Sequence, residues 1–290
     1  MNFSLQSILD HFGFEFRPFT LVPDPKFLYF SKQHLRAQSI LDYGIMSCAP
    51  ITVISGEIGT GKTTLLRELM TRLPENLTVG LVANAAPANR VEMLRLVLIA
   101  LDITPEDTQS YASLYVQLER FLVAEYGEGR RVVLVFDEAQ NLDRDSLEHL
   151  RMLTNINFSD HELVQLILIG QPELLKMIGR ADLRQLAQRV SAYVALGAMT
   201  QDDVEAYVKF RLRVVGASED IFEEDTFGLI YKGTDGIPRL VNQLCDYALL
   251  YAFGAGEKTV SRASVKKVLE DNYVLGLNRE EPINFERSGA

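Results

Sequence analysis

One eight-residue segment constrains this chain more than any other. It runs from Gly56 to Thr63 and reads Gly-Glu-Ile-Gly-Thr-Gly-Lys-Thr, which is the G-x-x-x-x-G-K-[ST] pattern of a Walker A loop. The apolar run Ile51–Ile54 precedes it and predicts a buried strand, and leucines at helical spacing follow it. A strand, a glycine-rich loop and a helix N-terminus in this order predict a cradle for phosphate groups, because backbone N–H groups and the helix dipole attract the same anion.

The loop predicts a nucleoside triphosphate, ATP, as the ligand. Lys62 would reach the β- and γ-phosphates, and the hydroxyl of Thr63 would ligate Mg²⁺. The residues predicted to bind the nucleotide are Gly56, Glu57, Ile58, Gly59, Thr60, Gly61, Lys62, Thr63 and Thr64.

A second apolar run, Val132–Phe136, ends in the carboxylates Asp137 and Glu138. It predicts a buried parallel strand whose C-terminal end lies where open α/β sheets bind ligands. Asp137 would hold Mg²⁺ together with Thr63, and Glu138 would act as the general base for an attacking water. Glu138 favours a hydrolase over a small-molecule kinase, because a kinase uses a substrate hydroxyl as its nucleophile.

The remaining apolar runs predict a doubly wound α/β fold. Strands are expected at 77–82, 163–169 and 192–196, and helical segments at 90–101, 113–125 and 147–153 alternate with them. Gln171 follows one strand and would contact the γ-phosphate as a sensor; the alternative is a turn glutamine before a proline. Asn84 follows another strand, and we considered that it holds Glu138 in an unproductive pose until a partner binds.

Composition limits the classes of partner. The 290 residues are 47% hydrophobic and carry a formal net charge of −10. An acidic chain without a Lys/Arg-rich run disfavours a surface made for nucleic acid, although a local basic patch is compatible with an acidic total. No signal peptide or apolar run of about 18 residues is visible. The expected location is the cytoplasm, with no direct membrane insertion.

Together these segments resemble the AAA+ ATPases, and more narrowly the family of general secretion pathway protein A, the ExeA-like ATPases. The similarity covers roughly residues 8–272. Besides the two motifs above, it includes an N-terminal box, the extension of the acidic strand end, a fourth-strand signature and a segment around Pro238; these lie at 12–29, 137–142, 168–174 and 236–245.

The resemblance implies the division into domains. An N-terminal box (1–30) would pack on a P-loop core (31–198), a C-terminal α-helical lid would follow (199–272), and a polar mobile tail would end the chain (273–290). The residues support a helical lid independently: Thr200 begins a capping box, Pro238 suits the first turn of a helix, and Ser261 suits an N-cap.

The resemblance also assigns roles to three arginines. Arg239 would be the sensor 2 arginine that reaches the γ-phosphate from the lid. An arginine finger that acts on a neighbouring subunit's nucleotide would be Arg189 or, as second candidate, Arg184. For each, a surface arginine is the alternative. A finger would make a homo-oligomer the active species.

For function, the family implies an ATP hydrolase that assembles or switches an envelope machine: type II secretion, a type IV pilus or a polysaccharide exporter. A membrane or envelope assembly protein would be the partner and would recruit the chain to the inner membrane. Two alternatives remain open at this point, a DNA-bound regulator of transposition and a slow nucleotide-dependent interaction switch. The acidic net charge weighs against DNA.

Overall fold

The structure, a computed structural model, describes residues 4–22, 24–84, 86–107, 110–158 and 161–271. Its contacts divide the chain into two compact units. One comprises residues 32–58 and 62–197, and the other comprises residues 1–31, 59–61 and 198–290. The tail predicted at 273–290 lies outside the described residues, as does Asn272.

The first of these units is built on a five-stranded sheet. Its strands are β1 (Ile51–Gly56), β2 (Leu77–Ala83), β3 (Arg131–Asp137), β6 (Val164–Gly170) and β7 (Val190–Leu196). They lie in the order β2-β3-β6-β1-β7, and every neighbouring pair is parallel. The predicted doubly wound parallel sheet is confirmed, and the strand that leads into the Walker A loop lies inside the sheet.

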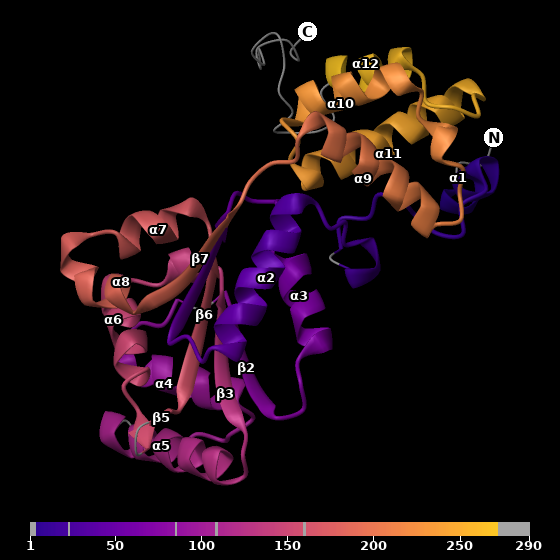
Figure 1. The fold of residues 1–290 in the computed structure, drawn as a ribbon. Helices are drawn as coiled ribbons and strands as arrows, with labels where there is room; N and C mark the ends of the chain where they lie inside the picture. Colours follow the sequence, from indigo (N-terminus) through magenta and orange to yellow (C-terminus); the bar gives the residue numbers. More distant parts are fainter. Residues whose placement is uncertain (1–3, 23, 85, 108–109, 159–160, 272–290) are drawn as a thin grey trace, which may run out of the picture. The chain divides into compact units, whose positions relative to one another are not determined.

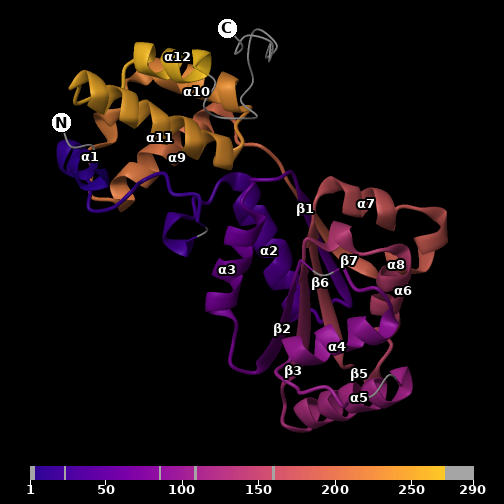
Figure 2. The same cartoon turned by 180° about the vertical axis from the view of Figure 1, so that it is seen from behind.

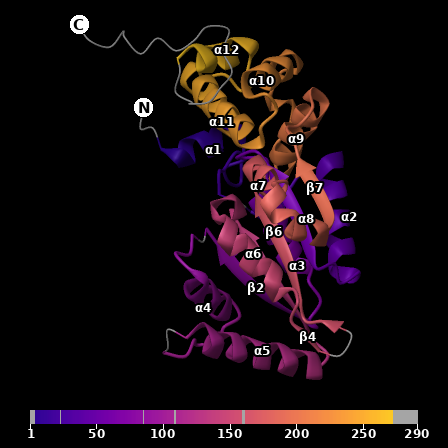
Figure 3. The ribbon, with the colours of Figure 1, turned by 90° about the vertical axis from the view of Figure 1, so that its left-hand side faces the viewer.

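Helices cover both faces of this sheet (Figures 1 and 3). One face carries α2 (Lys32–Met46) and α3 (Lys62–Arg72). The other face carries α4 (Arg90–Ala100), α5 (Tyr111–Gly127), α6 (Arg144–Leu153), α7 (Pro172–Ile178) and α8 (Arg184–Arg189). The two-residue strands β4 (Asn157–Phe158) and β5 (His161–Glu162) form a separate antiparallel pair, which the sequence did not predict.

The two helical layers explain why the strands are continuous apolar runs. In β3, Leu134 and Phe136 pack in the core beneath α4 to α8, whereas Val133 and Val135 pack beneath α2 and α3. Successive side chains of a strand point to opposite faces, so a strand covered on both sides is apolar at most of its positions. This burial holds the carboxyl ends of β1, β3 and β6 at one edge of the sheet.

The second unit is helical (Figures 1 and 2). It contains α1 (Leu5–Phe12), α9 (Gln201–Val214), α10 (Phe227–Thr234), α11 (Pro238–Ala255) and α12 (Arg262–Glu270). Thr200 and Asp203 form a complete capping box at the start of α9, and the Ser261 hydroxyl caps α12. Pro238 occupies the first turn of α11, where a missing N–H costs nothing. These three local predictions are confirmed.

The N-terminal box belongs to the helical unit. Its buried phenylalanines share a hydrophobic cluster with residues of α9 to α12. Arg211 of α9 is 4% exposed and holds the box in place. Its Nε donates to the Pro18 carbonyl at 2.6 Å, and its guanidinium lies 4.2 Å from the centre of the Phe27 ring. The sequence predicted residues 1–30 on the P-loop core; the contacts of Arg211 and the shared cluster instead group the described part of the box with the helical unit.

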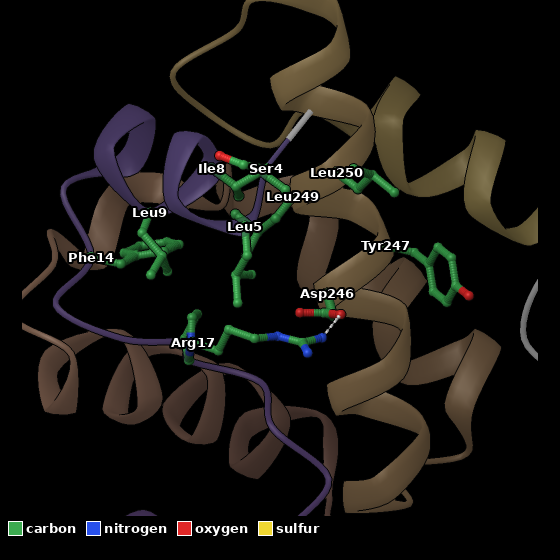
Figure 4. Close-up of a pocket in the computed structure, with 11 residues that line it drawn as sticks. Ser4, Leu5, Ile8, Leu9, Phe14, Arg17, Asp246, Tyr247, Leu249 and Leu250 are labelled. Carbon is green, nitrogen blue, oxygen red and sulfur yellow. Dashed lines mark hydrogen bonds and ion pairs between the residues drawn. The ribbon is translucent and has the colours of Figure 1, made fainter. Parts of the chain in front are cut away.

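A pocket of about 400 Å³ lies between α1 and α11 within the helical unit (Figure 4). Its lining is largely apolar and includes Leu5, Leu9 and Leu249. At one side Arg17 forms an ion pair with Asp246. The pocket is thus a feature of the N-terminal box against α11, and it contains none of the predicted site residues.

Candidate functional site

The Walker A loop connects β1 to α3. Gly59 has φ +85° and Gly61 has φ +96°. This left-handed region is open to glycine and strained for other residues, so both glycines are required by the path of the backbone. The loop begins where strand β1 ends and continues directly into the first turn of α3 at Lys62. A helix N-terminus, whose first N–H groups have no partner within the helix, therefore follows a tight glycine turn, which is the geometry of an anion site.

Lys62 is folded back over the start of this loop. Its ammonium donates to the carbonyl of Gly56 at 2.8 Å and to that of Glu57 at 3.0 Å. The residue is 6% exposed, and this burial lowers the pKa of Lys62, partly offset by the nearby carboxylates of Glu138 and Asp137. The ammonium has thus lost much of its hydration, and two backbone dipoles replace it. Phosphate oxygens are stronger acceptors and can take over these bonds.

Thr63 and Asp137 bring two oxygens together from different elements. The Thr63 hydroxyl of α3 lies 3.5 Å from Oδ2 of Asp137 at the end of β3. Burial raises the pKa of Asp137, while the backbone N–H of Glu138 lowers it and the Glu138 charge raises it. A half-buried carboxylate beside a hydroxyl fits Mg²⁺, which takes oxygen ligands and binds through one or two carboxylates plus phosphates.

The raised pKa of Asp137 has a consequence for stability. A carboxyl with a raised pKa binds its proton more tightly in the folded protein than in the unfolded chain. The free energy of unfolding therefore falls as pH rises from the pKa in the unfolded chain, about 3.9, through the raised pKa in the folded protein. At pH 7 the ionised side chain therefore destabilises the nucleotide-free protein. We expect Asp137→Asn to raise its melting temperature by a few degrees at pH 7, with the difference shrinking as pH falls. A lower melting temperature at pH 7 would contradict this account.

Glu138 follows Asp137 in an unusual backbone conformation. Its φ is +56° and its ψ is +36°, the left-handed region, in which a side chain other than glycine is uncommon. The carboxylate is half-buried, and its Oε2 accepts from Nε2 of Gln140 at 2.6 Å and from Nε2 of Gln171 at 3.4 Å. Strain of this kind persists only where surrounding contacts hold it, and it concentrates at functional sites.

The structure therefore brings together most of the residues predicted from the two motifs. Thr63 lies 3.5 Å from Asp137, Gln171 lies 3.4 Å from Glu138, and Lys62 is close enough for the charges of both carboxylates to affect its pKa. The edge combines a positive group in a glycine-rich loop, two carboxylates with different surroundings, and an amide from the end of the neighbouring strand.

Comparison with known proteins agrees with this geometry. The AAA domain family matches residues 46–178. General secretion pathway protein A of Aeromonas hydrophila is 36% identical over 254 residues, which is 88% of this chain. Residues 46–178 belong to the AAA domain family. The chain spans about half the length of that relative, 46%.

Solved structures show the same AAA fold at low identity. The ORC2 protein of Aeropyrum pernix in an ADP form has a TM-score of 0.64 and 18% identity, over 88% of this chain and 72% of that one. Cdc6p of Pyrobaculum aerophilum has a TM-score of 0.67 and 18% identity, over 88% of this chain and 70% of that one. Drosophila ORC bound to DNA has a TM-score of 0.66 and 16% identity, over 93% of this chain and 67% of that one. At these identities the likeness concerns the fold alone.

The predicted arginines of this AAA ATPase have different surroundings. Arg239 lies in the first turn of α11. Arg189, at the end of α8, is held within its own unit: its guanidinium donates to the carbonyl and the hydroxyl of Thr154 at 3.2 and 3.0 Å and to Glu162 at 3.2 Å. Arg184 is exposed at the start of α8. The two finger candidates thus differ in how freely their side chains can reach outward.

Sequence reasoning missed the turn that follows the carboxylates of this AAA ATPase. Residues Ala139–Asn141 form a short 3₁₀ helix, η2. Its last residue, Asn141, donates to Oδ1 of Asn84 at 3.0 Å, so among the described residues the Asn84 side chain contacts Asn141 and not Glu138. Its middle residue, Gln140, contacts Glu138. The signal available in the sequence was the polar pair Gln-Asn directly after Asp-Glu-Ala.

Proposed function

We propose that this AAA ATPase binds Mg-ATP in the Walker A loop and hydrolyses it with a positioned water. The observation that carries the proposal is the end of β3, where two adjacent carboxylates have separate partners. Asp137 faces the Thr63 hydroxyl, and Glu138 is turned by its left-handed backbone toward the amide of Gln171. One carboxylate is placed for a cation and the other for a proton, which is the division of roles that hydrolysis requires.

Lys62 would exchange its two carbonyl acceptors for oxygens of the β- and γ-phosphates. The exchange keeps the ammonium fully hydrogen-bonded and adds an attraction between opposite charges in a partly dehydrated site. The N–H groups at 57–64 would bind the remaining phosphate oxygens. Thr63 and Asp137 would hold Mg²⁺, which when bound neutralises charge on the β- and γ-phosphates.

Glu138 would take a proton from the attacking water as the bond from water oxygen to the γ-phosphorus forms and the bond from that phosphorus to the β–γ bridging oxygen breaks. ADP leaves with the bridging oxygen, and inorganic phosphate is released. The Gln171 amide, which comes from the end of β6, would donate to a γ-phosphate oxygen. Following the family pattern, Arg239 would contribute a positive charge to the same phosphate.

We propose Arg184 as the arginine finger. Arg189 was the preferred candidate from sequence, but its contacts with Thr154 and Glu162 favour a structural role in joining α8 to the β4–β5 region. An exposed arginine at the start of α8 can reach a neighbouring copy without breaking bonds of its own. A finger supplied in trans stabilises charge on the transferring phosphoryl group and requires a homo-oligomer.

The machine that this hydrolysis serves is proposed from the relative named above. The name of that relative refers to general secretion, and we infer that the chain drives or switches assembly of an envelope machine such as a secretion system, a pilus or a polysaccharide exporter. Among the described residues, no helix combines the length and apolar character needed to cross a membrane. We therefore propose that it acts on the cytoplasmic side and meets the inner membrane through a protein partner.

Steady-state ATP turnover at increasing protein concentration, with and without duplex DNA at low salt, tests the proposal. We expect turnover per subunit to rise with concentration, because a finger in trans acts only in the oligomer, and to be unaffected by DNA. Stimulation by DNA would replace the envelope role with that of a DNA-bound regulator. Tight ATP binding without turnover at any concentration would favour the slow nucleotide switch.

A further inference from the structure

The turn η2 lies between the ends of two neighbouring strands. Because β3 lies between β2 and β6 in the sheet, residues that follow β3 can reach either neighbour. Asn141 reaches toward β2, where it donates to Asn84. Gln140 reaches toward β6, where its Oε1 accepts from the backbone N–H of Gln171 at 2.9 Å. Glu138 is thus anchored by the turn that follows it, on both sides of its own strand.

Gln140 uses both ends of its amide. While Oε1 accepts from the Gln171 N–H, Nε2 donates to Oε2 of Glu138 at 2.6 Å. A backbone N–H requires an acceptor and a carboxylate requires a donor, so the two partners determine which way the amide points. Glutamate could not donate to the carboxylate, and an apolar side chain could make neither bond. The side chain therefore joins Glu138 directly to the end of β6.

Gly170, the last residue of β6, leaves room for this bridge. A Cβ at this position would lie 2.8 Å from Oε1 of Gln140 and 3.2 Å from the Gln140 backbone nitrogen. Contacts below 3.0 Å force a group to move, so even alanine at position 170 would displace the amide. The Gln140 side chain can therefore occupy this position only because residue 170 has no side chain.

We propose that Gln140 is a positioning residue that fixes the Glu138 carboxylate for catalysis. The proposal rests on the proposed function, because it requires Glu138 to be the base. A bond to Oε2 leaves the other carboxylate oxygen to face the attacking water and selects one rotamer in a strained backbone. Small errors in the placement of a reacting group can reduce a rate by about 100-fold.

The test compares Gln140→Met, which keeps length and removes both polar atoms, with wild type. We expect kcat for ATP to fall by roughly 10- to 100-fold while the Kd for ATP stays within about twofold, because the side chain orients the base and does not bind phosphate. Gly170→Ala, which displaces the same amide without altering it, should reduce kcat in the same direction.

Gln165 provides the matched control. It is a buried glutamine of β6, the strand that ends at Gly170. Its Nε2 donates to the carbonyls of Gly44 and Ala49 at 3.3 and 3.4 Å. Gln165→Met should lower the melting temperature and leave kcat nearly unchanged. If Gln140→Met lost kcat only in proportion to a similar fall in melting temperature, its role would be structural and the proposal would be wrong.

A double mutant separates this inference from the function on which it rests. In a Glu138→Gln background, Gln140→Met should cause no further loss of residual turnover, because a residue that acts through Glu138 has nothing left to position. Equal fractional losses in both backgrounds would overturn the positioning role. Undiminished turnover of Glu138→Gln itself would instead overturn the assignment of Glu138 as the base. If Glu138→Gln were inactive and Gln140→Met kept an unchanged kcat, only the inference about Gln140 would be overturned.

Discussion

Replacing Lys62 with alanine is expected to abolish ATP binding at micromolar concentrations. The ammonium is the positive side chain buried at the start of the phosphate loop, where it is 6% exposed and bonds two carbonyls that phosphate oxygens would replace. Two bonds between charged groups, at about 1.5–3 kcal/mol each, correspond to a loss of affinity of roughly 100-fold or more. Isothermal titration calorimetry with ATP and Mg²⁺ measures this loss directly.

The variant should lose binding without losing its fold. Because burial lowers the pKa of Lys62, the charged side chain is held in the folded protein at some cost, and its removal should leave the melting temperature of the nucleotide-free protein unchanged or raised. Lys176→Ala is a suitable control, since Lys176 is 77% exposed on α7 of the same unit. Micromolar affinity retained by Lys62→Ala would show that the loop is not the phosphate site.

Glu138→Gln should have the second large effect, a fall in turnover of about 100-fold or more with ATP binding preserved. The substitution keeps the size of the side chain and its Cβ, so the strained backbone of β3's end is not altered further. The Gln140 amide can still donate to the new amide oxygen. What is lost is the ability to accept a proton from water.

The readout for this variant is the state of the bound nucleotide. Nucleotide extracted from the protein after incubation and separated by chromatography should be mainly ATP for Glu138→Gln and ADP for wild type. Glu128→Gln, which changes an exposed carboxylate paired with Arg130, serves as control. Wild-type levels of hydrolysis by Glu138→Gln would remove this residue from the role of base and direct attention to other carboxylates at the sheet edge.

The parts of this fold that the sequence predicted are those controlled by local pattern. Five apolar runs became the five strands, because the inner strands of a sheet covered on both faces are apolar at most positions. The capping box at Thr200 and the proline at the start of α11 act within one turn of helix. The Walker A loop and the carboxylates at the end of β3 lie at the same edge of the sheet, because parallel strands all have their carboxyl ends at one edge.

The parts that the sequence did not predict depend on which elements become neighbours. Aromatic residues of the N-terminal box were expected on the sheet unit, yet Phe27 packs on Arg211 of the helical unit. The bridge from Gln140 to Gln171 exists because β6 lies next to β3, an arrangement that the chain between these two residues, which are 31 positions apart, does not specify. Likewise, the bonds of Arg189 to Thr154 follow from the packing of α8 near the end of α6.

The strand order also has a consequence for the newly synthesised chain. β1 is made early, but its two sheet neighbours, β6 and β7, leave the ribosome more than 100 residues later. Until then, Ile51–Gly56 has no partner on either edge, and an unpaired apolar strand can pair with other chains. Contacts between residues so distant in sequence form slowly. A chain interrupted before Val190 would leave β1 open on one edge, so fragments that end in this region should aggregate whereas a chain that includes β7 can close its sheet.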